Sequence, residues 1–175
     1  MCGILAVIGK YRYKEIPESL KNRGVDSNGI YEDDNVQLFQ TRLQITGSDY
    51  IDIPIETDRY ILLFNGEIYN YKELNKELND FNFKYDSDFE TALYSYIKWG
   101  ISFTDKLNGQ YAIFIWDKLE KKQSVFFDDL RIKTLYKREY DNSIIYSSNI
   151  KSFPEIKFKK INNTGYGNIS DAILL

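Results

Sequence analysis

The chain has 175 residues, of which 43% are hydrophobic, 28% charged and 16% aromatic, a balance typical of a folded globular protein. Its formal net charge is −3 and it has no basic block, which argues against a nucleic-acid partner. It contains one Cys and no His, which excludes an internal disulfide, the common zinc sites and any mechanism that uses an imidazole as its base.

Neither targeting nor domain division is indicated by the sequence. The first apolar stretch, 4–8, is shorter than a secretory h-region, and no stretch approaches the roughly 18 apolar residues of a membrane span. The chain has three prolines and no linker, repeat or low-complexity tract. We therefore expect a single cytoplasmic domain over residues 1–175 with no membrane partner.

Segments rich in β-branched and aromatic residues alternate with turn residues along the chain. They predict strands over residues 3–9, 35–45, 59–68, 110–118, 123–129 and 143–148. Apolar stripes at helical spacing predict helices over 69–81 and 87–100, and more weakly over 13–24. Strands outnumber helices, and the two stronger helices lie in the middle of the chain, which favours an α+β fold with largely antiparallel sheets.

The ends of the two stronger helices have recognisable capping residues. Asn70 is placed to cap the first helix. Ser87 and Glu90 have capping-box spacing at the start of the second helix, and Gly100 stands where a C-cap belongs.

Cys2 is the only cysteine and follows the initiator methionine. If Met1 is removed, Cys2 carries both a thiol, with a pKa of about 8.5, and an α-amine, with a pKa of about 7.7–8.0. These values are close enough for the amine to accept the thiol proton, so Cys2 could be a nucleophile in a chain without histidine. The alternative is that Cys2 is a small residue at the start of a strand.

Asn65 and Gly66 follow the apolar stretch YILL. A carboxamide donor beside a closely approachable backbone N–H suits an oxyanion hole, which stabilises the negative charge formed when a nucleophile attacks an amide. The same dipeptide is also the strongest short hairpin signal, so a simple turn is the alternative.

Three charged residues could bind a small zwitterion. Arg42 could take a carboxylate in a bidentate contact, while Glu67 and Asp88 could take an ammonium group. Each also has an ordinary alternative. Arg42 and Glu67 could be solvated strand residues, and Asp88 could simply favour the helix N-terminus.

Several stretches, in order along residues 1–153, resemble the class II glutamine amidotransferase family, most closely the glutaminase domain of glutamine-hydrolysing asparagine synthetases. They are MCGI, NRGVDSNGIY, TRLQI, LLFNGEIYNYKEL, SDFE, KLNGQYAIFIWD and IYSSNIKSF. The resemblance implies a four-layer αββα N-terminal-nucleophile hydrolase sandwich of two mostly antiparallel sheets. It implies hydrolysis of L-glutamine to glutamate and ammonia through a γ-glutamyl thioester, without metal or organic cofactor.

The resemblance also implies roles for individual residues. Cys2 would be the nucleophile, and Asn65 with the Gly66 N–H would form the oxyanion hole. Arg42 would bind the substrate carboxylate, Glu67 and Asp88 its ammonium, and the backbone around Ile45 and Thr46 would complete the pocket.

The chain departs from the family pattern at several positions. Asn22 and Val25 replace the His and Pro of His-Arg-Gly-Pro-Asp. Gln40 and Gln44 replace a His and a Ser near Arg42, where we expect them at the pocket rim.

The segment FDDLRIKT stands where the family has Arg-Asp-x-x-Gly-x-Lys-Pro, with Phe127, Arg131 and Thr134 at the changed positions. Because the family places this segment toward the synthetase half, the changes put conventional domain coupling in doubt. An ATP-dependent synthetase domain is not recognisable in the sequence, so we expect a separate acceptor subunit. Two alternatives stay open: a catalytically silent binding or regulatory domain of the same fold, and an amidohydrolase for another γ-glutamyl amide.

Overall fold

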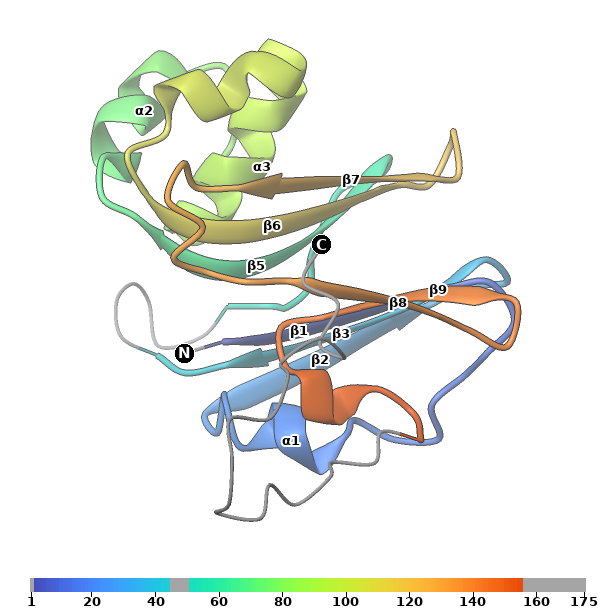
Figure 1. Ribbon diagram of the computed structural model, residues 1–175. Helices are drawn as coiled ribbons and strands as arrows, with labels where there is room; N and C mark the ends of the chain where they lie inside the picture. Colours follow the sequence, from blue (N-terminus) through green and yellow to red (C-terminus); the bar gives the residue numbers. More distant parts are fainter. Residues whose placement is uncertain (1, 45–50, 156–175) are drawn as a thin grey trace.

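Two stacked antiparallel β-sheets form the centre of the structure, a computed structural model that describes residues 2–44 and 51–155 (Figure 1). The first sheet has the order β2 (Ser27–Glu32), β3 (Val36–Arg42), β1 (Gly3–Ile8), β9 (Ser143–Ser147), β8 (Tyr136–Tyr140). The second sheet has the order β4 (Ile55–Glu56), β5 (Tyr60–Ile68), β6 (Gly109–Asp117), β7 (Lys122–Phe127).

Helices cover the outer face of each sheet (Figure 1). Two helices, α2 (Tyr71–Glu77) and α3 (Asp88–Trp99), lie over the second sheet, and the 3₁₀ helix η1 (Gly100–Lys106) follows α3. The short helix α1 (Glu18–Lys21) and the 3₁₀ turn η2 (Ile150–Ser152) lie beyond the first sheet. The four layers confirm the expected αββα sandwich of the N-terminal-nucleophile hydrolase type. Within 2–44 and 51–155, none of the helices has the length and apolar character to cross a membrane.

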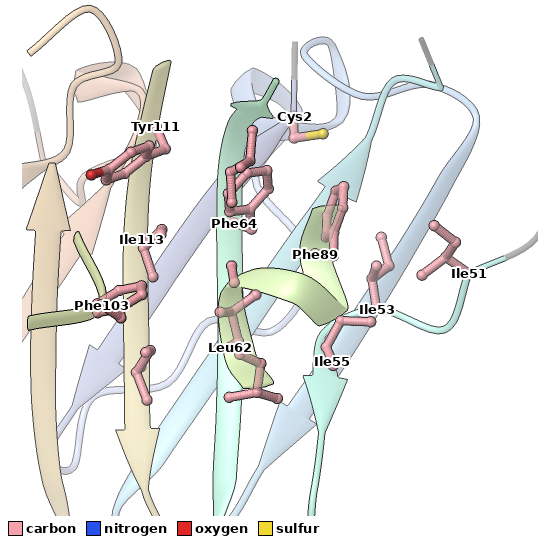
Figure 2. Close-up of a cluster of buried hydrophobic side chains, with 14 of the residues drawn as sticks. Cys2, Ile51, Ile53, Ile55, Leu62, Phe64, Phe89, Phe103, Tyr111 and Ile113 are labelled. Atoms are coloured by element: carbon pink, nitrogen blue, oxygen red, sulfur yellow. The ribbon is translucent and has the colours of Figure 1, made fainter. Parts of the chain in front are cut away.

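Alternation of side chains along the central strands produces separate apolar layers. In β5, Ile61 and Leu63 pack between the two sheets, whereas Leu62 and Phe64 pack under α3. Figure 2 shows the helix-side layer, in which Cys2 lies at the edge of the cluster. Since side chains of a strand alternate between faces, neighbouring residues of one strand can serve different layers. Near-continuous apolar runs such as YILLF follow from burial on both faces.

All six predicted strands are confirmed, and three strands at sheet edges, β2, β4 and β8, escaped prediction. In β2 burial alternates between half-buried and exposed, β4 has two residues, and β8 is polar, so none has the apolar pattern of a core strand. The predicted helix over 13–24 shortens to the single turn α1, which Pro17 precedes at the N-cap position.

Both predicted N-cap residues, Asn70 and Ser87, stand at the starts of their helices, but the predicted side-chain bonds form only in part. Asn70 makes no cap bond; its amide instead bonds Lys106 O and Asn108 N, both at 2.9 Å. Ser87 does cap α3 by accepting the Glu90 N–H, and Gly100 ends the helix as predicted. Glu90 accepts from the N–H groups of Lys84 and Tyr85 instead of completing the capping box.

Candidate active site

One cavity collects most of the predicted site residues. It has a volume of about 70 Å³ and lies where the ends of β1, β3 and β5 meet the start of α3. Its lining consists of Cys2, Arg42, Leu43, Asn65, Gly66, Glu67, Asp88, Phe89, Gln110 and Lys133. Six of the eight predicted site residues are therefore together, and the other two, Ile45 and Thr46, lie outside the described residues.

Cys2 and Arg42 reach the cavity from adjacent strands of the first sheet. Gly3 pairs with Thr41, so Cys2 and Arg42 come next at the same end of the β1–β3 ladder. Arg42 shares its face of β3 with Val36 and Leu38, which pack between the sheets, and it is 2% exposed. Strand pairing thus places the buried Arg42 opposite Cys2 at this end of the sheet. A solvated strand position for Arg42 is excluded.

The Cys2 thiol has an apolar setting. Its side chain joins the cluster that contains Phe64 and Phe89, and burial raises the pKa of the thiol above its ordinary value (Figure 2). A hydrogen bond with the Leu43 backbone acts in the opposite direction and is the smaller effect. A thiol with a raised pKa needs a nearby base to become a thiolate at neutral pH.

Asn65 and Gly66 lie inside β5, so the hairpin-turn alternative is wrong. Asn65 shares its face of the strand with Ile61 and Leu63 and points toward the first sheet. Its side chain is 1% exposed, yet neither the amide nitrogen nor the oxygen has a hydrogen-bond partner among the described residues. Buried polar groups are normally satisfied, so an orphan carboxamide that lines a cavity indicates a ligand site.

The backbone of β5 also presents groups to the cavity. Tyr69 N–H bonds Asn108 O on the β6 side, and hydrogen-bonding groups alternate along an antiparallel strand. The N–H of Gly66, like that of Ile68, therefore points away from β6. It lies on the edge of β5 that β4 covers only at Ile61 and Leu62. Ile68 N–H donates to the Asp88 carboxylate at 3.2 Å, and the Gly66 N–H lies between that contact and Phe64.

Gly66 is required by the packing of the second sheet as well. A Cβ at this position would lie 2.2 Å from Gln110 O and 2.6 Å from Tyr111 Cα in β6. Real Cβ atoms do not approach backbone that closely, so a larger residue would push β5 away from β6. The same strand contact positions the N–H that faces the cavity.

Asp88 is the first residue of α3 and is buried against the cavity. Burial raises its pKa to about 6, the Ile68 N–H lowers it less, and the neighbouring Glu67 adds to the increase. A carboxylate that merely served a solvated helix N-terminus would be stabilised in its charged form. The raised pKa therefore reflects a buried carboxylate with Glu67 beside it, unlike a solvated helix-capping residue.

Lys133 also lines the cavity, although the sequence did not predict it as a site residue. The available signal was its place in FDDLRIKT, where it matches the Lys of the family pattern. Its backbone N–H donates to Asp128 at 3.3 Å, so the segment is anchored where it meets the site. The cavity thus contains two cationic and two acidic side chains.

The altered segment is held at Asp128, although Leu130 and Ile132 are 82% and 55% exposed. Phe127 and Arg131, which replace the Arg and Gly of the family pattern, contact each other, with the guanidinium carbon 4.9 Å from the ring centroid. Asp128 accepts backbone N–H bonds from Tyr111, Leu130, Ile132 and Lys133. Burial alone would raise the Asp128 pKa, but these donors outweigh it and hold the pKa below its ordinary value.

The sequence predicted Gln40 at the pocket rim, and this prediction is wrong. It is completely buried between the sheets and is absent from the cavity lining. Gln44, the other replacement, donates its backbone N–H to the Asp26 carboxylate at 2.6 Å. In the part of the chain that the structure describes, no group of three or more His, Cys, Asp or Glu residues could hold a metal ion.

The stacked sheets and the buried cysteine at the start of a central strand define the class as an N-terminal-nucleophile hydrolase fold. The structure is similar to that of a glutamine phosphoribosylpyrophosphate amidotransferase from B. subtilis, complexed with ADP and GMP. The TM-score is 0.68 at 17% identity, with coverage of 83% of this chain and 41% of that one. A family model described as glutamine amidotransferase domain matches residues 1–168, and the chain belongs to that family.

Similar curated proteins are asparagine synthetases. The glutamine-hydrolyzing asparagine synthetase 1 of Arabidopsis thaliana is 32% identical over 162 residues, with coverage of 86% of this chain and 28% of that protein. Asparagine synthetase 3 of Bacillus subtilis is 30% identical over 188 residues, with coverage of 97% and 30%. The chain therefore spans less than a third of the length of these relatives. It is a glutamine amidotransferase domain related to their glutaminase domains.

Proposed function

We propose that this domain hydrolyses L-glutamine through a γ-glutamyl thioester on Cys2, once Met1 has been removed. The observation that supports this most strongly is the buried, unpartnered Asn65 carboxamide in the same cavity as Cys2. Such a group costs about 1–3 kcal/mol of stability unless a ligand uses it. A domain that only bound a partner through its surface would have no need for it.

In the proposed first step, the Cys2 α-amine accepts the thiol proton and the thiolate attacks the side-chain amide carbon of glutamine. The oxyanion forms between the Asn65 carboxamide and the Gly66 N–H, which together supply two donors. Collapse of this intermediate returns the proton to the leaving nitrogen, releases ammonia and leaves the γ-glutamyl thioester. Water then attacks the thioester, glutamate departs, and the thiol is regenerated.

The remaining cavity charges suit the amino-acid end of the substrate. Arg42 is placed to bind the α-carboxylate through its guanidinium fork. Asp88 and Glu67 are placed to bind the α-ammonium. A bound ammonium would lower the raised pKa of Asp88, because an opposite charge favours the ionised form.

The ammonia would pass to an acceptor of the asparagine-synthetase kind. The two relatives described above have additional chain beyond the matched region, and their printed names combine glutamine hydrolysis with asparagine synthesis. We propose that residues 1–175 act as one glutaminase domain that works with an ATP-dependent synthetase unit. Ammonia transfer to purified candidate units, measured as glutamine-dependent product formation, tests this part separately.

Intact-mass spectrometry tests the proposed chemistry directly. The purified protein is weighed before and after treatment with a diazoketone analogue of glutamine, which alkylates the nucleophile of a site that recognises glutamine. We expect loss of one methionine and a single adduct on Cys2, absent from the Cys2→Ser variant. A retained Met1 without an adduct would overturn the proposal and favour a silent binding domain.

Substrate choice is tested by turnover. Glutamine, asparagine and larger γ-glutamyl amides are compared at equal concentration, with glutamate release as the readout. We expect glutamine to be preferred. A higher kcat/KM for a larger γ-glutamyl amide would identify a different amidohydrolase on the same scaffold.

A further inference from the structure

Gln40 makes an unusual connection between the two sheets. Its side-chain nitrogen donates to Phe64 O at 3.2 Å, and its side-chain oxygen accepts from Phe64 N–H at 3.2 Å. Gln40 belongs to β3 of the first sheet and Phe64 to β5 of the second. The side chain is completely buried, so these bonds form in a setting of low dielectric constant.

Among the described residues no strand pairs with β5 at Phe64, and these two bonds occupy that edge. Strand β4 pairs with β5 only at Ile61 and Leu62, so Phe64 lies beyond its end on the same edge. Buried backbone groups that lack a partner are costly, and the Gln40 carboxamide supplies one donor and one acceptor in the arrangement of a neighbouring strand. Phe64 immediately precedes Asn65 and Gly66.

We propose that Gln40 is a positioning residue that fixes the backbone of β5 at Phe64 and thereby holds Asn65 and the Gly66 N–H in place for the oxyanion. This rests on the proposed function of that pair. Two contacts flank Gly66 along this edge of β5. Gln40 bonds the backbone of Phe64 on one side, and Asp88 accepts a hydrogen bond from Ile68 N–H on the other. The Gly66 N–H is thus set between two fixed points.

The consequence is specific to catalysis. Donors aimed at a developing oxyanion act in the transition state, so a displaced donor lowers kcat more than it raises KM. The two bonds join Gln40 to Phe64 and involve neither Arg42 nor Asp88, which are proposed to bind the ends of the substrate. We therefore expect Gln40→Met, which keeps the side-chain length, to lower kcat about 10- to 100-fold with KM for glutamine within about 3-fold.

The same sheet provides a matched control. Gln37, also in β3 and 4% exposed, bonds the backbone of Tyr13 in the same way, with Tyr13 N–H at 2.8 Å and Tyr13 O at 3.1 Å. It lies on the opposite face of the first sheet, away from the cavity. Gln37→Met loses an equivalent pair of backbone bonds, so we expect it to lose stability while keeping the wild-type kcat.

Two further measurements separate positioning from general destabilisation. Gln40→His, whose two ring nitrogens diverge so that only one can meet a Phe64 backbone group, is expected to recover only part of the lost kcat. Amide hydrogen exchange at Phe64 is expected to accelerate at least about 10-fold in Gln40→Met and to stay unchanged in Gln37→Met.

The outcomes distinguish this inference from the proposed function. Equal kcat values for Gln40→Met and Gln37→Met would overturn the positioning role while leaving the glutaminase proposal intact. A wild-type protein without glutaminase activity or Cys2 alkylation would overturn the glutaminase proposal, and with it the catalytic purpose of the Gln40 contact. In that case, an unchanged rate of amide hydrogen exchange at Phe64 in Gln40→Met would also refute the proposal that Gln40 fixes the Phe64 backbone.

Discussion

Replacing Asn65 with Leu separates the stability of the fold from the chemistry of the site. Leu has a similar size and no polar atoms, so it fits a position that is 1% exposed and faces the neighbouring sheet. The carboxamide it removes has no protein partner among the described residues, and such a buried group costs about 1–3 kcal/mol. We expect Asn65→Leu to gain about 1–2 kcal/mol in free energy of unfolding.

The same change removes the proposed oxyanion donor. Loss of one such donor lowers kcat by about 10²–10³. Glutamate release gives kcat, and urea unfolding gives the stability. For a protein of this size, a gain of 1–2 kcal/mol corresponds to an increase in Tm of about 2–8 °C.

The control for this experiment is Ser95→Ala. Ser95 is completely buried in α3, and its hydroxyl also lacks a partner among the residues the structure describes. We expect this variant to keep its kcat without losing stability. If Asn65→Leu is instead less stable than wild type and retains its kcat, Asn65 is an ordinary structural amide, and the reasoning from its missing partner is refuted.

The remaining predictions concern Asp88 and Gly66. Because the folded-state pKa of Asp88, about 6, exceeds the ordinary value near 3.9, its contribution to stability is complete below pH 4 and is lost as pH rises through 6. The stability of Asp88→Asn relative to wild type should therefore rise by up to about 3 kcal/mol between pH 4 and 7 in urea unfolding. A stability difference between the two proteins that does not change with pH would contradict a raised pKa for Asp88. Below pH 6, KM for glutamine should increase in wild type, because a protonated Asp88 no longer binds an ammonium; a flat KM profile would remove Asp88 from the substrate site. Gly66→Ala should lose at least about 2 kcal/mol, because its Cβ meets Gln110 O at 2.2 Å; a loss under 0.5 kcal/mol would show that β5 and β6 separate easily.

Core strands and helices were predictable because burial leaves a periodic trace in the sequence. The apolar run before Asn65 marks β5, and the stripe after Ser87 marks α3. Strands β2, β4 and β8 were missed because an edge or very short strand buries too little surface to need an apolar pattern. Asn70 stands at the N-cap of α2 but makes no side-chain cap bond, because its amide bonds Lys106 of η1 and Asn108, which are distant in sequence.

The sequence by itself determined which groups are available for chemistry. One cysteine, no histidine and the residues around Asn65 restrict the base and the oxyanion donors to a short list, and FNGEIYNY identifies the family resemblance. It left two interpretations of Asn65-Gly66, a turn or an oxyanion hole, because a dipeptide has the same local propensity in either setting.

Only the tertiary structure excluded the turn and assigned Gln40 its place. Whether Asn65 is satisfied depends on what packs against β5 from the other sheet, and Gln40 reaches Phe64 across 24 positions of sequence. Such contacts arise from the stacking of two sheets, not from the pattern along either strand. The sequence therefore determines the chemical groups, and the packing of the sheets determines which of them remain unpaired and face the same cavity.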